Sequence, residues 1–430
     1  MKFCKTQRLV GALILSGSGL LWAQPQLSLQ AAVHEALRLD LGVLRYRQQA
    51  TSAREGALAA QQLPDPKLSL GLNNFPTDSF DTDQEPMTQI RFGLSQTFPA
   101  GDTRALRSAV AALDADTLGQ RAELRRHQVV QAARLRWLDA YYWQQALGIL
   151  EADRGLFDQL LTITQSLFAV GKRQQQDLLR AELEISRLQE RLMVARESAR
   201  AARARLSRWA GDGALAQPLP ARLPSLDLLP RGADSSAALR QHPRLRQLRK
   251  AVDRSQTMVR LAEQQYKPRV SVDLGYGYRD GDNLDGSNRA DFASLMVSVE
   301  LPLFSHQRQD RQVAAQVALH GSEQAHFDDA LREQLAALRA EQSHFRQLQT
   351  RRKWFEDDVL KKSAAQTQAT LNAYQSDTAD FADVMRAYLS AQTTQLDYQR
   401  LRVDEQKALA TLHFLAATPL PAVPEAAITP

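Results

Sequence analysis

Two long stretches between residues 101 and 209 contain no proline and carry apolar residues at helical spacing. A helix from Asp102 to Phe168 would be about 100 Å long, whereas helices in ordinary globular domains average about 11–12 residues. The second stretch carries a heptad seam at Leu178, Ala181, Ile185, Leu188, Leu192, Ala195, Ala199, Ala202, Leu206 and Trp209. The first contains matching runs at Leu135, Leu138, Tyr142, Ile149, Leu156, Leu160, Ile163 and Leu167. We therefore expect a long helical hairpin that spans a distance.

The composition favours helical rods over several compact domains. Ala, Leu, Gln, Arg and Glu dominate the 430 residues, as is typical of coiled coils. The 54 basic and 48 acidic residues give a formal net charge of +6. Because the two signs are interspersed along the helix faces, they are typical of solvated surfaces, and we expect no nucleic-acid partner.

The first 23 residues have the pattern of a secretory signal peptide, with a retained anchor helix as the alternative. A basic start precedes an apolar core too short to span a bilayer, at Lys2, Lys5 and Arg8 and then Leu9 to Leu21. Cleavage after Ala23 would remove three positive charges and no negative ones, which leaves a net charge of +3. It would also remove Cys4, the only cysteine. A mature chain without cysteine fits an oxidising periplasm without disulfides.

Four short runs alternate apolar and polar residues, which predicts strands with one apolar face. Their apolar members are Leu68, Leu70 and Leu72; Ile90, Phe92, Leu94 and Phe98; Val270, Val272, Leu274, Tyr276 and Tyr278; and Ala293, Leu295, Val297, Val299 and Leu301. Polar loops at residues 76–86 and 279–289 join the two strands of each pair. Further helices are predicted at about 28–62, 307–374 and 379–415.

The order of helix, two strands and helical hairpin occurs twice, which indicates an internal repeat. Ala36-Leu37-Arg38 recurs as Ala238-Leu239-Arg240, 202 residues later. At the hairpins, Asp177-Leu178-Leu179-Arg180-Ala181 matches Asp383-Val384-Met385-Arg386-Ala387. The expected organisation is a signal peptide at 1–23, repeat one at 24–211, a linker at 212–233, repeat two at 234–418 and a Pro-rich tail at 419–430.

Each strand run has the length and alternation of a strand in an outer-membrane barrel, apolar toward lipid and polar toward the lumen. Half-buried strands of a soluble sheet are the alternative. An open sheet in lipid would leave unpaired backbone groups at both edges, and the smallest such barrels have about eight strands. We therefore expect several chains to share one barrel. Helices with narrow seams also bury surface only against neighbours, so the assembly would form a tube that continues from a pore.

At its hairpin turns the chain resembles the TolC-like outer-membrane factor family, and the resemblance covers essentially the whole mature chain. The residues that carry it are Phe168-Ala169-Val170-Gly171-Lys172 with Asp177-Leu178-Leu179-Arg180-Ala181, and Tyr374 with Asp383-Val384-Met385-Arg386-Ala387. The resemblance implies a mainly α fold with a small β part. It also implies a trimer whose twelve-stranded outer-membrane β-barrel, four strands per chain, continues into a periplasmic α-helical barrel of twelve helices.

The resemblance further implies the outer-membrane exit duct of a tripartite efflux pump in a Gram-negative bacterium, which passively conducts small solutes or metal cations. Its partners would be outer-membrane lipid, a periplasmic adaptor (membrane fusion) protein and an inner-membrane RND-type transporter. The segment from Leu94 to Asp102 is similar to members of the heavy-metal efflux branch. Two alternatives stay open: a periplasmic coiled-coil adaptor or scaffold, and the exit duct of a protein secretion system. No nucleophile–base motif predicts an enzyme, and no spacing predicts a cofactor or metal site.

The resemblance places Asp383 in an acidic ring at the periplasmic entrance. Asp377, Asp380 and Asp383 step by three, so they would share a face of a helix that starts early enough. Three copies at a narrow mouth would then favour cations. The alternative for Asp377 and Asp380 is that they cap the helix start.

Two positions depart from the family pattern at this entrance. Arg386 stands where the family has a second acid, and Ala379 stands where the arginine partner of Tyr374 would lie. Gly171 permits the left-handed backbone that a tight turn between helices needs. The candidates for this turn and for adaptor contact are Gly171, Lys172, Asp177 and Arg180.

Overall fold

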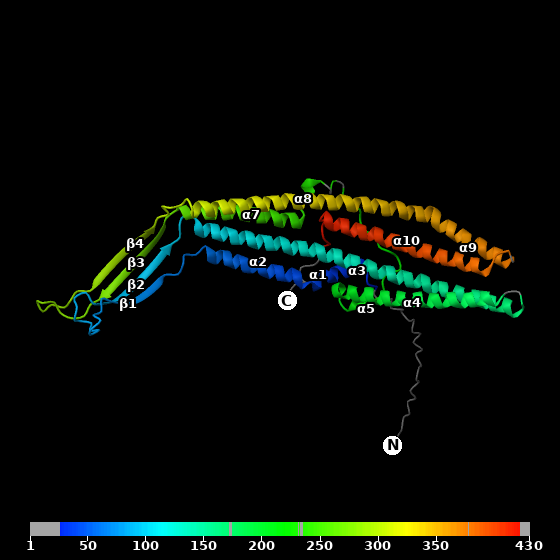
Figure 1. The fold of residues 1–430 in the computed structure, drawn as a ribbon, viewed down its shortest axis with the longest axis horizontal. Helices are drawn as coiled ribbons and strands as arrows, with labels where there is room; N and C mark the ends of the chain where they lie inside the picture. The colour runs from blue at the N-terminus through cyan, green and yellow to red at the C-terminus, as the bar shows by residue number, and fades with distance from the viewer. Residues whose placement is uncertain (1–25, 172–173, 231, 233–234, 377, 422–430) are drawn as a thin grey trace, which may run out of the picture.

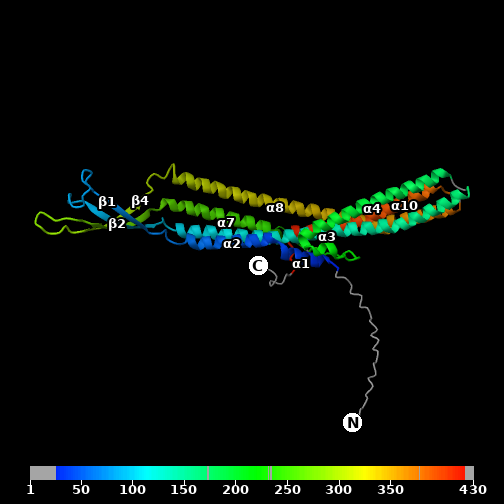
Figure 2. The same cartoon turned by 90° about the horizontal axis from the view of Figure 1, so that it is seen from below.

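The computed structural model describes residues 26–171, 174–230, 232, 235–376 and 378–421. A four-stranded sheet lies at one end of the long axis, and the turns of two helical hairpins lie at the other (Figure 1). The view turned by 90° shows the same separation (Figure 2). The signal peptide predicted at residues 1–23 and the tail from residue 422 lie outside the described residues.

Most of the described chain is helical. The helices are α1 (Leu29–Leu39), α2 (Leu41–Ala60), α3 (Thr103–Ala169), α4 (Gln175–Ala210), α5 (Gly213–Ala216), α6 (Ser236–Leu239), α7 (Pro243–Glu263), α8 (Gln309–Trp354), α9 (Leu360–Gln375) and α10 (Phe381–Leu415). A 3-10 turn, η1 (Gln264–Tyr266), follows α7, and a π-helical segment, η2 (Phe355–Val359), lies between α8 and α9. No helix within the described residues combines the length and the apolar composition that a membrane crossing requires.

The long first hairpin is confirmed: α3 has 67 residues and α4 has 36. The heptad seam of α4 faces its neighbours, with Ala181, Leu188, Leu192, Ala195, Ala202 and Leu206 buried. The matching runs on α3 are only partly buried in one chain. Ile163 is 46% exposed, whereas Phe157, Leu160 and Thr164 are buried. Within one chain α3 thus packs Phe157 and Leu160 against α4 and α10 and leaves Ile163 exposed.

The single helix predicted at 28–62 is wrong, because the chain breaks it at Asp40. The backbone of Asp40 is extended, and its carboxylate accepts a hydrogen bond from the Val43 N–H at 2.9 Å, which caps α2. The same carboxylate lies 2.6 Å from the Arg125 guanidinium on α3. A side chain that hydrogen-bonds to the backbone just after it competes with continuous helix formation. The ion pair with Arg125 on α3 holds the Asp40 carboxylate in this position, and the helix therefore breaks there.

A buried aromatic cluster joins the N-terminal segment and the linker to the rods. The indole N–H of Trp137 donates to the Leu27 carbonyl at 2.9 Å, and the ring stacks on Tyr141 with centroids 5.5 Å apart. The Tyr141 hydroxyl donates to the Ala221 carbonyl at 3.0 Å. Because buried polar groups need partners, these bonds fix where residues 26–28 and 219–226 cross the helices.

The sheet consists of β1 (Lys67–Asn73), β2 (Gln89–Phe98), β3 (Arg269–Tyr278) and β4 (Phe292–Glu300), all antiparallel and in the order β1-β2-β3-β4. These bounds agree with the four predicted strand runs within one residue. The central pair, β2 and β3, joins strands that lie far apart in the sequence. Both β1 and β4 pair on one side only.

Candidate functional site

The four strands place their apolar residues on one face of the sheet. Pairing aligns Leu68, Leu94, Leu274 and Leu295 in one row across all four strands. The neighbouring row contains Leu70, Phe92, Tyr276 and Ala293. Because side chains alternate between faces along a strand, every second position adds to the same surface. The register thus unites four separate apolar patterns into one continuous face.

This apolar face has no cover from the described part of the chain. Leu68 is 81% exposed and Leu295 is 67% exposed, and all nine residues of β4 are exposed. Figures 1 and 2 show that the sheet projects beyond the ends of the helices. An exposed apolar face of this extent marks a site that contacts a membrane or another protein. The unpaired edges of β1 and β4 leave backbone groups for further strands.

The opposite face is polar and rich in glycine. Its residues from β1 to β4 include Lys67, Ser69, Ser95, Asp273 and Ser294, with glycines at Gly71, Gly93, Gly275 and Gly277. Such a face suits water, whereas the apolar face suits lipid. The two faces of the sheet thus differ in polarity.

The loops beyond the strands, at residues 76–86 and 279–289, form one cluster at the end of the molecule. Thr82 donates to the Asp280 carboxylate at 2.9 Å, which joins the β1–β2 loop to the β3–β4 loop. Arg289 donates to the Asp83 carbonyl at 3.0 Å, and Arg279 donates to the Pro86 carbonyl at 3.0 Å. These arginines satisfy backbone acceptors of the other loop, so the two loops hold each other in place.

At the first hairpin turn, Gly171 has the predicted left-handed backbone, with φ of +72°. Its N–H donates to the Phe168 carbonyl at 2.9 Å, which closes α3. Asp177 lies in the first turn of α4, where a carboxylate favours the helix N-terminus. Arg180 is exposed one turn later, and Lys172 lies outside the described residues.

At the second turn, Tyr374 is buried against Phe381, with ring centroids 6.1 Å apart in an edge-to-face arrangement. Because α10 begins only at Phe381, Asp380 occupies the N-cap position with extended backbone instead of a place on the helix face. Its carbonyl accepts the Asp383 N–H at 3.1 Å. Asp377 lies outside the described residues, and Ala379 is half-buried beside Asp380.

Asp383 and Arg386 form an ion pair at 3.1 Å, and their side chains are 47% and 76% exposed. The Arg386 guanidinium is therefore directed at the Asp383 carboxylate. One positive charge at this distance opposes the field of Asp383 at the end of the hairpin.

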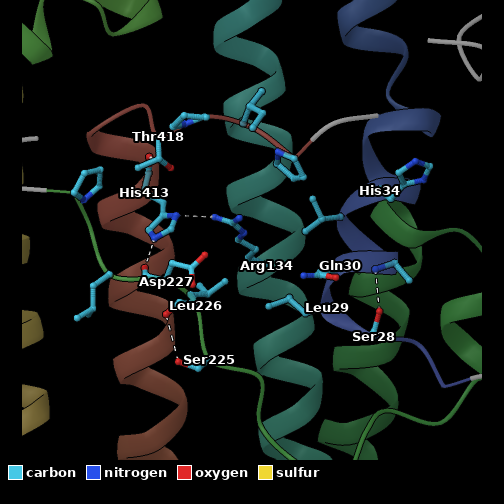
Figure 3. Close-up of a pocket in the computed structure, with 17 residues that line it drawn as sticks. Ser28, Leu29, Gln30, His34, Arg134, Ser225, Leu226, Asp227, His413 and Thr418 are labelled. Carbon is cyan, nitrogen blue, oxygen red and sulfur yellow. Dashed lines mark hydrogen bonds between the residues drawn. The ribbon is translucent and has the colours of Figure 1, made fainter. Parts of the chain in front are cut away.

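Figure 3 shows a polar cluster in a cavity of about 850 Å³ between α1, α3, α10 and the linker, which the sequence reasoning missed. Arg134 donates to Nδ1 of His413 at 3.4 Å, and Nε2 of His413 donates to the Asp227 carbonyl at 2.7 Å. Burial lowers the pKa of His413. Because Arg134 can only donate to Nδ1, the two contacts fit the neutral tautomer that carries its proton on Nε2. These residues are far apart in the sequence, and no spacing rule joins them.

A second unpredicted network crosses from α8 to α10 beside the π-helical segment. Arg352 pairs with Glu405 at 2.5 Å and with Glu356 at 2.9 Å, and the Tyr398 hydroxyl donates to Glu356. The hydrogen bond from Tyr398 is the main cause of the lowered pKa of Glu356. A π-helical turn shifts the register of side chains in a helix, so α8 and α9 need not present one continuous face. Among the described residues, no group of His, Cys, Asp and Glu could hold a metal ion.

No protein-family model matches the chain, and no curated protein matches it. Solved structures do match. CusC, described in connection with transmembrane channel formation, has a TM-score of 0.76 at 15% identity, over 91% of this chain and 92% of that chain. The outer membrane protein VceC from Vibrio cholerae has a TM-score of 0.75 at 16% identity, over 90% and 96%. The CmeC outer membrane channel from Campylobacter jejuni has a TM-score of 0.75 at 11% identity, over 90% and 85%. These likenesses show that the chain shares the fold of these proteins.

Proposed function

We propose that this chain is a TolC-like outer-membrane factor, which forms the outer-membrane exit duct of a tripartite efflux pump and performs no covalent chemistry. Its fold is shared with proteins whose descriptions name an outer membrane protein, VceC, and an outer membrane channel, CmeC. The observation that carries the proposal is the uncovered apolar face of the sheet, whose four strands expose leucines and valines in register.

Closure of the barrel follows from the two open edges. In hydrocarbon every backbone N–H and C=O needs a partner within the protein, and β1 and β4 each lack a neighbour on one side. In a cyclic assembly, β4 of one copy can pair with β1 of the next copy. The same β4–β1 interface then recurs between each pair of neighbouring copies. Three copies would give a closed barrel of twelve strands.

The helices support the same assembly. Several large apolar side chains on the rods are exposed in the single chain, at Leu179, Leu183, Met193, Val194, Val317, Leu319 and Trp354. Exposed apolar residues on long helices are expected to pack against neighbouring helices. Three copies around one axis would bury these residues between chains and leave a periplasmic tube below the barrel.

The partners of this duct are proposed from the resemblance and not from contacts. They are outer-membrane lipid at the sheet, and a periplasmic adaptor protein and an inner-membrane RND-type transporter at the hairpin turns. The heavy-metal branch rests on the segment Leu94 to Asp102 alone. The metal, drug or protein nature of the cargo would be set by the transporter.

A periplasmic adaptor or scaffold is the weaker candidate. In such a protein the strands would form a soluble sheet with an apolar side against other elements, whereas this sheet projects away from the helices (Figure 2). The exit duct of a secretion system would share every feature described above, so the cargo and not the fold separates it from an efflux duct.

Two adjacent residues on opposite faces of β4 provide a matched test. Leu295 lies on the apolar face and Met296 lies on the polar face, and both are more than half exposed. An arginine on the lipid face costs about 2–4 kcal/mol at the bilayer midplane. Leu295→Arg is therefore expected to reduce the yield of oligomer in outer-membrane fractions, whereas Met296→Arg retains it. Equal yields for the two variants would contradict a lipid-facing surface.

A further inference from the structure

One arginine on the polar face of the sheet is surrounded by glycine. Arg91 on β2 lies between Gly71 on β1 and Gly277 on β3 in the same row. The next row toward the helices places Gly93 beside Gly275. Four glycines thus border a single guanidinium-bearing residue, in a part of the chain that is otherwise regular strand.

Of these four glycines, Gly275 provides space for Arg91 and not backbone freedom, whereas a Cβ at each of the other three would meet a different side chain, namely Asn73, Ser69 or Gln89. Residues with positive φ include other glycines, but none of these four, so each adopts extended backbone that any residue could adopt. A Cβ at Gly275 would lie 3.0 Å from both Nε and NH2 of Arg91, and it would also meet the Ser294 hydroxyl. Glycine inside a strand often marks a close approach of another group. At Gly275 the missing side chain allows the guanidinium group to lie close to β3.

Arg91 is also the unbalanced charge of the polar face. The charged residues on this face of the four strands are Lys67, Arg91, Arg269, Asp273 and Glu300. Arg269 pairs with Glu300 at 3.5 Å, and Lys67 and Asp273 lie in one row on either side of Ser95. Within the described residues Arg91 has no carboxylate partner.

The arginine of the adjacent loop is held differently. Arg279 donates to the Ala290 carbonyl at 2.7 Å and to the Pro86 carbonyl at 3.0 Å, and its guanidinium lies over the Phe292 ring at 3.9 Å. Arg279 therefore has a structural role that accounts for its position. Arg91 has no such bonds in the described chain, so its N–H groups remain available to solutes on the polar face.

We propose that Arg91 forms a cationic ring in the outer part of the barrel lumen and makes the duct favour anionic over cationic solutes at that level. The inference rests on the proposed function, since the ring requires a barrel shared by several copies. Rotational symmetry places the Arg91 residues of all copies at one height. Charge of one sign within low-dielectric walls focuses the field on passing ions. At this level the ring attracts anionic solutes and repels free metal cations, whichever cargo the transporter delivers.

Planar-bilayer recording of the purified oligomer in a KCl gradient tests the ring. Arg91→Gln removes the charge and retains much of the side-chain length, and Arg91→Lys is the matched control that keeps the charge. The ratio of chloride to potassium permeability is expected to fall at least about twofold in Arg91→Gln and to stay near the wild-type value in Arg91→Lys. An unchanged ratio in Arg91→Gln would overturn the ring, although the duct itself would stand.

If Arg91→Gln fails to assemble, block of the wild-type channel by a multivalent anion tests the ring instead. Pyrophosphate added on the outer side of the wild-type channel is expected to reduce conductance, because a multivalent anion binds among several guanidinium groups. No effect of pyrophosphate on wild-type conductance would count against the ring. A wild-type protein that forms no channel in the bilayer would instead contradict the proposed function.

Discussion

In the proposed duct, Asp383 and Arg386 at the end of the second hairpin would have opposing effects on a passing ion, because their charges have opposite sign. Their 3.1 Å pair is exposed, and exposed pairs of this kind stabilise a helix by only about 0.3–0.5 kcal/mol. The pair therefore matters more for the local potential than for folding. A ring of Asp383 residues would act with the opposing charge of Arg386 beside it.

Replacing each member separately should shift ion selectivity in opposite directions. Asp383→Ala is expected to raise anion permeation, because it leaves the Arg386 charge alone at the entrance. Arg386→Ala is expected to raise cation permeation, because Asp383 is then unopposed. Reversal potentials in planar bilayers measure both effects. Selectivity that does not change in either variant would count against an entrance ring at this position.

His242 carries a pH dependence of stability. Its Nε2 donates to the Phe414 carbonyl at 3.1 Å, and its Nδ1 accepts the Arg244 N–H at 3.1 Å, which caps α7. Burial lowers the pKa of His242 from 6.5 to about 4. Because the unfolded chain binds the proton more readily, stability is complete above the unfolded pKa and is lost as the pH falls from about 6.5 toward 4.

At about pH 5 this linkage costs about 2 kcal/mol relative to neutral pH. His242→Asn keeps an acceptor for the cap of α7 but cannot titrate, so its melting temperature should fall less between about pH 7.5 and pH 5 than that of the wild type. Thermal unfolding in detergent at both pH values measures the difference. Burial also lowers the pKa values of His127 and His413, so some pH dependence should persist. An identical fall in both proteins would exclude His242 as its source.

At the scale of elements, the junction of α1 and α2 depends on one carboxylate that makes two contacts. Asp40 caps α2 through the Val43 N–H and pairs with Arg125 on α3. Its side chain is 7% exposed, so water is a poor substitute for either partner. Asp40 therefore links the start of α2 to a contact with α3.

Asp40→Ala should destabilise this junction by about 2 kcal/mol, from the lost cap and the unpaired Arg125. Asp40→Asn keeps an oxygen that can accept the Val43 N–H, so its loss should be smaller. Limited proteolysis near Gly42 and thermal unfolding would both report the change. Wild-type cleavage and melting in Asp40→Ala would show that the junction is held by other contacts.

At the scale of the whole molecule, long helices separate the sheet from the hairpin turns (Figure 1). The uncovered apolar face and the exposed apolar side chains of the rods both call for neighbouring copies. Detergent extracts should therefore contain one oligomer of three chains by native mass spectrometry. It should resist reducing agents, because a chain cleaved after Ala23 has no cysteine, and it should dissociate on heating. A soluble monomer without detergent would contradict the whole proposal.

Local periodicity was sufficient to predict the strands and the long helices. The four strands begin and end within one residue of their predicted runs, and α3 covers the predicted rod. The single helix predicted at 28–62 was wrong, because Asp40 breaks it through its cap and its ion pair with Arg125. At the hairpins Gly171 has its predicted backbone, whereas the roles of Asp383, Arg386 and Tyr374 in gating stay predictions.

The sequence by itself determined the lengths of the rods, the two faces of each strand and the number of strands, because these depend on neighbours within one or two turns. Only the tertiary structure decided that β2 pairs with β3, so that four apolar patterns share one face and Arg91 lies between Gly71 and Gly277. It also decided that His413 meets Arg134 and that Arg352 meets Glu405. These contacts join residues far apart in the chain, and their positions depend on how whole helices and strands pack.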